Sequence, residues 1–153
     1  MTNQKQIKIE AIERGVAIDH IPAGQALNII DILNLREDKN CIISIGMNLA
    51  SKKMGKKDVI KVENKFIYKT DLEKISLVAP QATISFIKNF KVGEKIRVHV
   101  PDVVHGLIKC KHPNCITNHE KIKTRFYLVK EKPLEFKCHY CERKIKSDEI
   151  KIE

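Results

Sequence analysis

Cys110-Lys-His-Pro-Asn-Cys115 and Cys138-His-Tyr-Cys141 are the two stretches that decide how this 153-residue chain is interpreted. Each places two sulfur atoms on a short turn, with C-x4-C spacing in the first and C-x2-C spacing in the second. Two such turns, joined by a segment long enough for a hairpin, can bring four thiolates into a tetrahedron around Zn²⁺. Four sulfurs complete that shell and leave no position for water or substrate. The pattern therefore predicts a structural zinc site and not a catalytic one.

Disulfide bonds and unrelated core cysteines are the alternatives for these four residues. Disulfides suit small secreted scaffolds in an oxidising compartment. Met1 is followed by a polar, lysine-containing segment without the apolar region of a signal peptide, so we expect a cytoplasmic protein with reduced cysteines. His112, His119 and His139 are close enough in sequence to be alternative ligands, although four sulfurs already complete the shell.

The composition predicts a folded protein with an anionic partner. Hydrophobic residues make up 42% of the chain, which suits a folded globule, and no apolar run approaches the length of a membrane span. The formal net charge is +10 with neutral histidines. Such an excess suits nucleic acid, nucleotide phosphates or an acidic protein surface; ordinary solvated lysines are the alternative explanation.

The pattern of apolar residues predicts an α+β fold for residues 1–100. Alternation and breakers predict strands near 7–11 and at 16–21, which together form one bent edge element, a central strand at 41–49, and further strands at 58–63, 82–87 and 95–100. Helices are predicted at 23–35 and, from the capping box Thr70-x-x-Glu73, at 71–78. This order matches a ferredoxin-like α/β sandwich, in which one antiparallel sheet carries both helices on a single face.

Residues 101–153 form the second predicted domain, a small zinc ribbon of the rubredoxin-like kind. Residues 101–106 are predicted to be the linker, and short strands are expected at 122–129 and 134–137. Because this segment is short and rich in lysine, it has little apolar surface to bury, and a metal is needed to hold it together.

No set of catalytic residues is visible, so we expect that the chain is not an enzyme. It has no G-x-S-x-G, H-E-x-x-H or Walker motif. Asp19 and His20 are adjacent in a predicted strand, and alternation would point them to opposite faces. Lys57, Lys61 and Lys95, together with His20, could instead converge on a triphosphate while Asp19 accepts from ribose hydroxyls. The alternative is three solvated lysines.

Five collinear motifs carry a resemblance to a known family. They are Ile-Asp-His-Ile-Pro-Ala at 18–23, Met-Gly-Lys-Lys-Asp at 54–58, Ile-Lys-Val-Glu-Asn at 60–64, Ala-Pro-Gln-Ala-Thr at 79–83, and the paired cysteines. Together they resemble the regulatory chain of bacterial and archaeal aspartate carbamoyltransferase along essentially the whole chain. The resemblance implies a non-catalytic allosteric subunit in pyrimidine biosynthesis.

The resemblance also implies partners for each domain. Residues 1–100 would bind the nucleotide effectors CTP and ATP, with UTP as a further candidate, and pair with a second regulatory chain. Residues 101–153 would carry one structural Zn²⁺ and dock on the catalytic chain, so that regulatory dimers link catalytic trimers. No membrane or nucleic-acid partner is expected.

Site residues follow from the resemblance by position. Asp19 would hold the ribose, His20 and Lys95 the phosphates, Lys61 the base and ribose, and Lys57 the phosphates or a second nucleotide. The base pocket would be lined by Glu10, Ala11, Ile12 and Ala17 and closed by Ile87, Phe90 and Val92. The metal ligands would be Cys110, Cys115, Cys138 and Cys141. Asn114, Glu142 and Arg143 would face the catalytic chain.

Two other functions are weighed beside this one. A zinc-ribbon nucleic-acid-binding protein is suggested by the net charge and by Lys121, Lys123, Arg125 and Lys130, but an aromatic content of 5% with no Trp provides few stacking platforms. A metalloenzyme would need an open coordination position, which four sulfurs do not leave.

Overall fold

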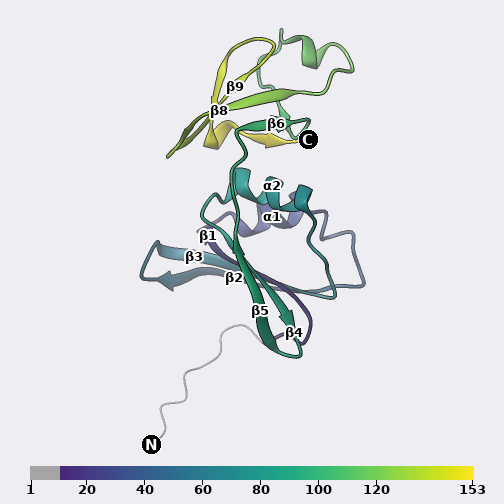
Figure 1. Ribbon diagram of the computed structural model, residues 1–153, viewed down its shortest axis with the longest axis vertical. Helices are drawn as coiled ribbons and strands as arrows, with labels where there is room; N and C mark the ends of the chain where they lie inside the picture. The colour runs from purple at the N-terminus through teal and green to yellow at the C-terminus, as the bar shows by residue number, and fades with distance from the viewer. Residues whose placement is uncertain (1–10) are drawn as a thin grey trace, which may run out of the picture.

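The computed structural model describes residues 11–153, which form two hydrophobic cores joined near residue 100 (Figure 1). Most of the strand expected near residues 7–11 therefore lies outside the described residues, as does the predicted site residue Glu10. None of the helices in the described part is long and apolar enough to cross a membrane.

The first core lies between a five-stranded sheet and two helices. The strands are β1 (Gly15–Pro22), β2 (Ile42–Ser51), β3 (Gly55–Glu63), β4 (Thr83–Lys88) and β5 (Lys91–Arg97), and their order in the sheet is β2-β3-β1-β4-β5. Every neighbouring pair is antiparallel. Helices α1 (Ala26–Ile32) and α2 (Lys69–Val78) cover the same face, and no helix of residues 11–153 covers the opposite face (Figure 1). The predicted ferredoxin-like α+β sandwich is confirmed.

Two strand placements in the prediction were wrong. The strand expected at the edge, β1, lies at the centre of the sheet, and β2, expected at the centre, lies at one edge. Val16 and Ile18 of β1 are fully buried, whereas Ile42 of β2 is 60% exposed. An apolar run does not distinguish a buried central strand from an edge strand that presents apolar side chains to solvent.

Both helices differ from their predicted limits. Helix α1 ends at Ile32 instead of Leu35, because Asn34 takes a left-handed φ of 54° and the N–H of Leu35 donates to the carbonyl of Ile30. Helix α2 begins two residues early. The N–H of Tyr68 donates to the Asp71 carboxylate at 3.0 Å, so Asp71, and not Glu73, is the acidic capping residue.

The second core is built from short strands around two buried phenyl rings. The strands are β6 (Val103–His105), β7 (Ile108–Lys109), β8 (Arg125–Glu131), β9 (Leu134–Cys138), β10 (Lys144–Lys146) and β11 (Lys151–Ile152), with 3-10 turns at Ile116–Asn118 and Ser147–Glu149. They form a β10-β9-β8-β6 sheet and a β11-β7 pair. Residues 101–106 are thus not simply a linker, since β6 pairs with β8 in this sheet.

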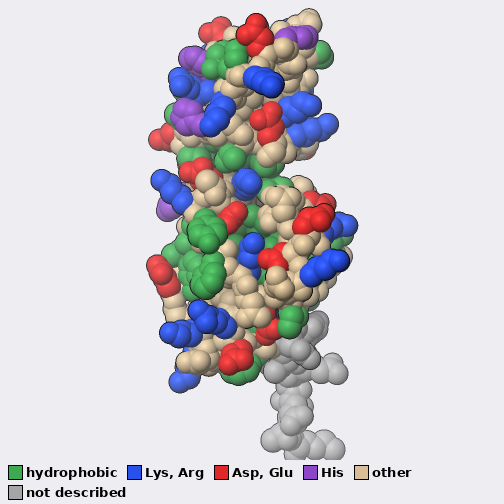
Figure 2. Space-filling view, turned by 90° about the vertical axis from the view of Figure 1, so that its right-hand side faces the viewer, with side chains coloured by type: hydrophobic (Ala, Val, Ile, Leu, Met, Phe, Trp, Pro, Cys, Tyr) green, Lys and Arg blue, Asp and Glu red, His purple; other side chains and the backbone are tan. Residues whose placement is uncertain are grey.

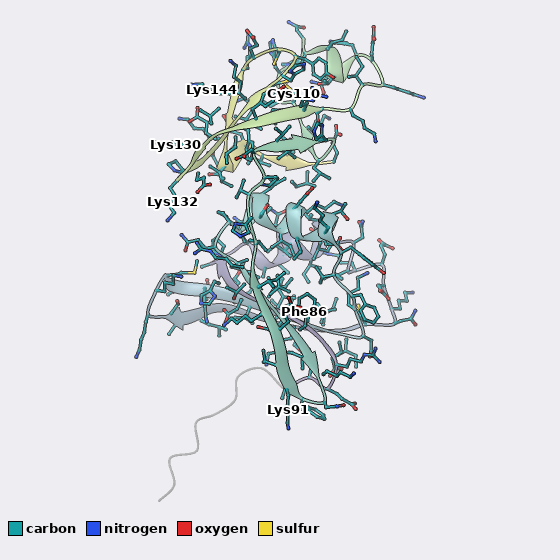
Figure 3. All side chains as sticks on the ribbon, in the orientation of Figure 1. Phe86, Lys91, Cys110, Lys130, Lys132 and Lys144 are labelled. Atoms are coloured by element: carbon teal, nitrogen blue, oxygen red, sulfur yellow. The ribbon has the colours of Figure 1, made fainter. Side chains whose placement is uncertain are left out.

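The two parts meet at the helix face of the first sheet. Leu77 of α2 is buried in the second core, beside Phe126 and Phe136. A cavity of about 510 Å³ lies at the junction between the start of α1 and the β8–β9 turn. Figure 2 shows hydrophobic side chains along the waist between the two parts, and Figure 3 shows Lys132 at the tip of the β8–β9 hairpin.

Candidate metal centre and effector face

Four cysteine sulfurs converge in the second core. Cys110 Sγ lies 3.7 Å from Cys141 Sγ, and Cys115 Sγ lies 3.8 Å from Cys138 Sγ. All four ligand atoms are within 4.8 Å of one another. A tetrahedron with Zn–S bonds of 2.3 Å has sulfur edges of about 3.8 Å, so the sulfur atoms already have the spacing that a four-thiolate zinc site requires. A disulfide, with sulfurs about 2.05 Å apart, is not present at these separations.

Local hydrogen bonds fix the two cysteine turns. In the first turn, the N–H of Cys115 donates to the carbonyl of His112, and the Asn118 side-chain amide donates to the carbonyls of Cys110 and His112. In the second turn, the N–H of Glu142 donates to the carbonyl of Cys138 at 2.9 Å, and Glu142 adopts a left-handed φ of 60°. The sulfurs are therefore held by backbone geometry that the short spacings dictate.

The ionisation of the four cysteines depends on a cation at this site. Burial raises the pKa of the Cys110 and Cys138 thiols. Burial also opposes ionisation of Cys115, but hydrogen bonds from the hydroxyl and N–H of Thr117 lower the pKa of this thiol to about 7. Four thiolates this close together, three of them buried, would repel one another without a cation, so the donor set fits a thiophilic divalent metal. His139 is not part of the cluster, and its Nδ1 pairs with the Tyr127 hydroxyl at 2.7 Å.

A row of four residues in register crosses the open face of the first sheet, with a lysine at each end. Lys61 on β3 is in register with Ala17 on β1, Ala17 with Ser85 on β4, and Ser85 with Lys95 on β5. Directly paired antiparallel residues share a face. Three strand spacings separate Lys61 from Lys95, which places their backbones roughly 14 Å apart. The small side chains of Ala17 and Ser85 leave a floor between two cations.

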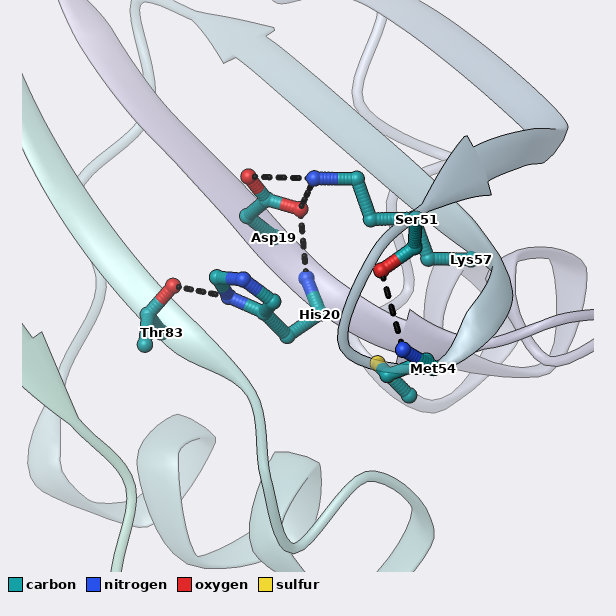
Figure 4. Close-up of polar contacts among 6 residues, drawn as sticks. All are labelled: Asp19, His20, Ser51, Met54, Lys57 and Thr83. Carbon is teal, nitrogen blue, oxygen red and sulfur yellow. Dashed lines mark hydrogen bonds and ion pairs between the residues drawn. The ribbon is translucent and has the colours of Figure 1, made fainter.

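A second row extends the same face. Asp19 is in register with Thr83, and Thr83 with Arg97. Lys57 Nζ reaches both carboxylate oxygens of Asp19, at 2.9 and 3.2 Å (Figure 4). These charged residues thus come from three strands, β1, β3 and β5, onto one surface, although the strands are far apart in the sequence: Asp19, Lys57, Lys61, Lys95 and Arg97.

A bulge in β1 sets the position of His20. The pairing of β1 with β3 shifts between Ile18 and Ile21, and His20 takes a left-handed φ of 58°. The expectation that regular alternation separates Asp19 and His20 is therefore wrong at this point. The His20 N–H donates to Asp19 Oδ1 at 2.6 Å, and the ring Nδ1 lies 3.0 Å from Thr83 Oγ1 (Figure 4).

Asp19 is held in its ionised form. Partial burial raises its pKa, but the Lys57 ammonium and the His20 N–H lower it by more, so the net shift is below the ordinary value of 3.8. A carboxylate that is already paired with an ammonium can accept hydrogen bonds from hydroxyl groups, as a ribose would provide.

The other predicted pocket residues lie around the β4–β5 turn and the start of β1. Ile87 is in register with Gly15 and with Val92. Phe90 and Val92 are 64% and 61% exposed, and the N–H of Phe90 donates to the carbonyl of Glu13. This bond brings the turn close to the segment that contains Ala11 and Ile12, of which Ile12 is buried and Ala11 exposed.

A partly open cavity lies beside this region, next to the start of β1. This cavity of about 340 Å³ is lined by Arg14, Phe66, Phe86 and Ile87, and it touches only this last predicted residue. The candidate site is therefore an open face and not a closed pocket.

The sequence analysis did not identify two polar residues of this region as candidate functional residues. Arg97 follows Lys95 by two residues, and the alternation of β5 could have assigned it to the same face. Asp58 is completely buried and accepts three backbone N–H groups, as described below. No local pattern marks Asp58, because its donors come from distant segments.

Comparison with known proteins places both parts of the chain in one family. A family model described as "Aspartate carbamoyltransferase regulatory chain, allosteric domain" matches residues 7–99, and one described as "Aspartate carbamoyltransferase regulatory chain, metal binding domain" matches residues 102–151. The chain belongs to the aspartate carbamoyltransferase regulatory chain family. It is thus a regulatory and not a catalytic chain.

Similar regulatory chains of aspartate carbamoyltransferase match along nearly their whole length. The Pyrococcus horikoshii chain is 49% identical over 146 residues, covering 95% of this chain and 96% of that one. The Pyrococcus furiosus chain is 48% identical with the same coverage. The Thermoplasma volcanium chain is 46% identical over 148 residues, covering 96% and 97%. The predicted family is confirmed, and the nucleic-acid-binding alternative is not favoured.

Proposed function

We propose that this chain is the effector-sensing subunit of an aspartate carbamoyltransferase, acting in the cytoplasm in pyrimidine biosynthesis. Residues 1–100 bind nucleotide effectors and pair with a second copy. Residues 101–153 hold one structural Zn²⁺ and dock on the catalytic chain. The observation that carries the effector half is the convergence of Lys57, Lys61, Lys95 and Asp19 on one open sheet face.

The geometry of that face supports CTP and ATP as ligands, with UTP as a third candidate. Lysines on both sides of Ala17 and Ser85 suit a triphosphate, because each contact is charge-assisted. Asp19, held ionised by Lys57, suits the ribose, and Ile87 with Val92 gives the base an apolar contact. The contacts predicted from the sequence for Glu10, Ala11, Ile12, His20 and Phe90 complete the proposed pocket.

Calorimetry with CTP and ATP tests this site. Lys95→Ala removes one charge-assisted contact, worth roughly 1.5–3 kcal/mol, so affinity should fall about tenfold or more. Lys91→Ala is the matched control, since Lys91 lies on the same strand at the hairpin tip (Figure 3). The effector proposal is wrong if neither nucleotide binds the wild-type chain, or if both variants bind equally well.

The metal is proposed to be Zn²⁺, held by Cys110, Cys115, Cys138 and Cys141. When bound, it supplies a rigid cross-link between two turns and no open coordination position. Three exposed residues adjoin the two cysteine turns: Asn114, Glu142 and Arg143. A metal that fixes the turns would also hold these three side chains on one surface. We propose this surface as the docking site for the catalytic chain.

Sedimentation velocity with a purified catalytic chain tests the docking site. Arg143→Glu should weaken the complex at least tenfold, because a cation is replaced by an anion at the contact. Arg36→Glu, in the first part of the chain, makes the same charge change and should not affect association. Equal weakening by the two variants would point to a general charge effect and against this surface.

The β2 edge supports the second regulatory chain as a partner. Its apolar residues Ile42, Ile45 and Met47 are exposed, and an exposed apolar edge strand is a template for pairing. Ile42→Asp should convert a dimer into a monomer in sedimentation equilibrium, whereas Leu27→Asp on α1 should not. A monomeric wild-type chain at micromolar concentration would contradict the proposed dimer.

A further inference from the structure

Asp58 is a completely buried carboxylate whose partners are three backbone N–H groups. Its Oδ2 accepts from Gly24 at 2.8 Å and from Ala26 at 3.1 Å, and its Oδ1 accepts from Asn48 at 2.9 Å. These donors come from the turn before α1, the first residue of α1 and strand β2. One side chain therefore ties together segments that are otherwise far apart in the sequence.

Two of the three donor residues lie at irregular points of the backbone. Gly24 has a left-handed φ of 92°, and Asn48 has one of 59° in a part of β2 where the pairing with β3 shifts between Gly46 and Leu49. A residue with left-handed φ persists where its surroundings fix it. The hydrogen bonds to Asp58 provide that fixation on both sides of β3.

Asp58 also adjoins the effector face. The preceding residue, Lys57, forms the ion pair with Asp19, and it is in register with Pro22 at the end of β1. The β1 bulge that contains His20 leads directly into this Pro22–Gln25 turn. Lys57 and His20 are therefore directly connected along the chain to the residues that Asp58 holds.

The same segment borders the second part of the chain. Pro22, Gln25 and Asn28 line one side of the 510 Å³ cavity at the junction. Residues of the β8–β9 turn and the Ser147–Glu149 turn, including Lys132 and Asp148, line the other side. The start of α1 therefore lies between the effector face and the metal-binding part.

We propose that Asp58 is a positioning residue that couples the effector face to the junction with the metal-binding part. This inference rests on the proposed function. A rearrangement of Lys57 and His20 on ligand binding is passed through the Asp58 hydrogen bonds to the start of α1, and from there to the junction. A carboxylate suits this role because it offers acceptors only, so it can hold donors on both oxygens at once.

Asp58→Asn is the decisive substitution. The asparagine keeps the shape, but its NH₂ group must face either Asn48 N–H or the Gly24 and Ala26 N–H groups, so one side of the link is lost. Asp38→Asn is the matched control. Asp38 also accepts a backbone N–H, from Asn40, and pairs with Lys65, but it contacts neither the effector face nor the junction.

The test uses the full chain in complex with the catalytic chain. Two quantities are measured for each variant: the Kd of CTP and ATP by calorimetry, and the ratio of catalytic activity with and without saturating nucleotide. We expect Asp58→Asn to bind nucleotide within threefold of wild type while its activity ratio falls to one. Asp38→Asn should keep both quantities.

The outcomes separate this inference from the proposed function. If Asp58→Asn keeps the wild-type activity ratio, Asp58 does not couple the two parts; if it loses nucleotide binding, Asp58 shapes the ligand site instead. Either result overturns the inference, while the proposal that the wild-type chain binds nucleotide effectors still stands. A wild-type chain that binds no nucleotide overturns the proposed function and the inference with it.

A second measurement decides the matter if Asp58→Asn does not fold. Hydrogen exchange of the wild-type complex is compared with and without saturating CTP. Exchange at the amides of Gly24, Ala26 and Asn48 should change severalfold, and those of β10 should not change. Unchanged exchange at all three amides in the saturated complex would overturn the inference.

Discussion

Replacing Cys138 by serine should release the metal and unfold the second part of the chain. Structural zinc contributes about 10–16 kcal/mol in small zinc domains, so one thiolate of four accounts for roughly 3–4 kcal/mol. Cys138 is fully buried beside Phe136, and a serine hydroxyl left without a partner there costs about 1–3 kcal/mol more. The sum, about 4–7 kcal/mol, is comparable to the whole stability of a small domain.

Competition with a chromophoric chelator measures the zinc affinity, and hydrogen exchange measures the folding of residues 103–152. The thiolate loss alone should raise the zinc Kd by a factor of about 10²–10³. Cys41→Ser makes the same chemical change at a cysteine outside the metal cluster and should bind zinc as wild type does. Wild-type zinc affinity in Cys138→Ser, or full amide protection in the metal-stripped wild-type chain, would contradict a structural role of the metal.

Three other predictions concern the first sheet and the junction. Asp19 has a pKa below 3.8, so its ion pair with Lys57 stabilises the fold above that pH and loses its effect as the pH falls through the folded pKa. Because the pair is partly exposed, urea unfolding should show a stability difference between wild type and Asp19→Asn of no more than about 1 kcal/mol at pH 7. This difference should vanish near pH 2. A difference that grows as the pH falls would contradict the prediction. Gly15→Ala places a Cβ 2.0 Å from the Val62 carbonyl oxygen, so the free energy of unfolding in urea should fall by about 2 kcal/mol or more. Gly93→Ala is the control, and it should be nearly neutral because the nearest atom to its Cβ is 3.6 Å away. Equal losses of stability in the two variants would refute the clash. Leu77→Ala should destabilise the second part by about 2–5 kcal/mol in thermal unfolding, and an unchanged transition for that part would show that α2 does not support it.

The sequence predicted the metal cluster better than the sheet. Two short spacings confine Cys110 to Cys115 and Cys138 to Cys141, so few arrangements of the sulfurs were possible. The position of β2 was mispredicted because Ile42 and its neighbours are apolar yet exposed, and an apolar run does not reveal which neighbour covers it.

The lysines of the open sheet face could be named from the sequence, but their arrangement could not. Lys61 and Lys95 could be assigned to strands by alternation, while their registration through Ala17 and Ser85 depends on the strand order, which local patterns do not contain. The β1 bulge at His20 was also hidden, because its left-handed φ is set by contacts across the sheet. Asp58 was missed for the same reason.

The proposed regulation is tested most directly by the activity of the catalytic chain with saturating CTP or ATP. It is measured with the catalytic chain alone, with the zinc-loaded regulatory chain, and with the chelator-stripped regulatory chain. Nucleotide should change the activity only in the presence of the zinc-loaded chain. A nucleotide response that is equal in all three samples, or no response although the zinc-loaded chain is bound, would contradict it.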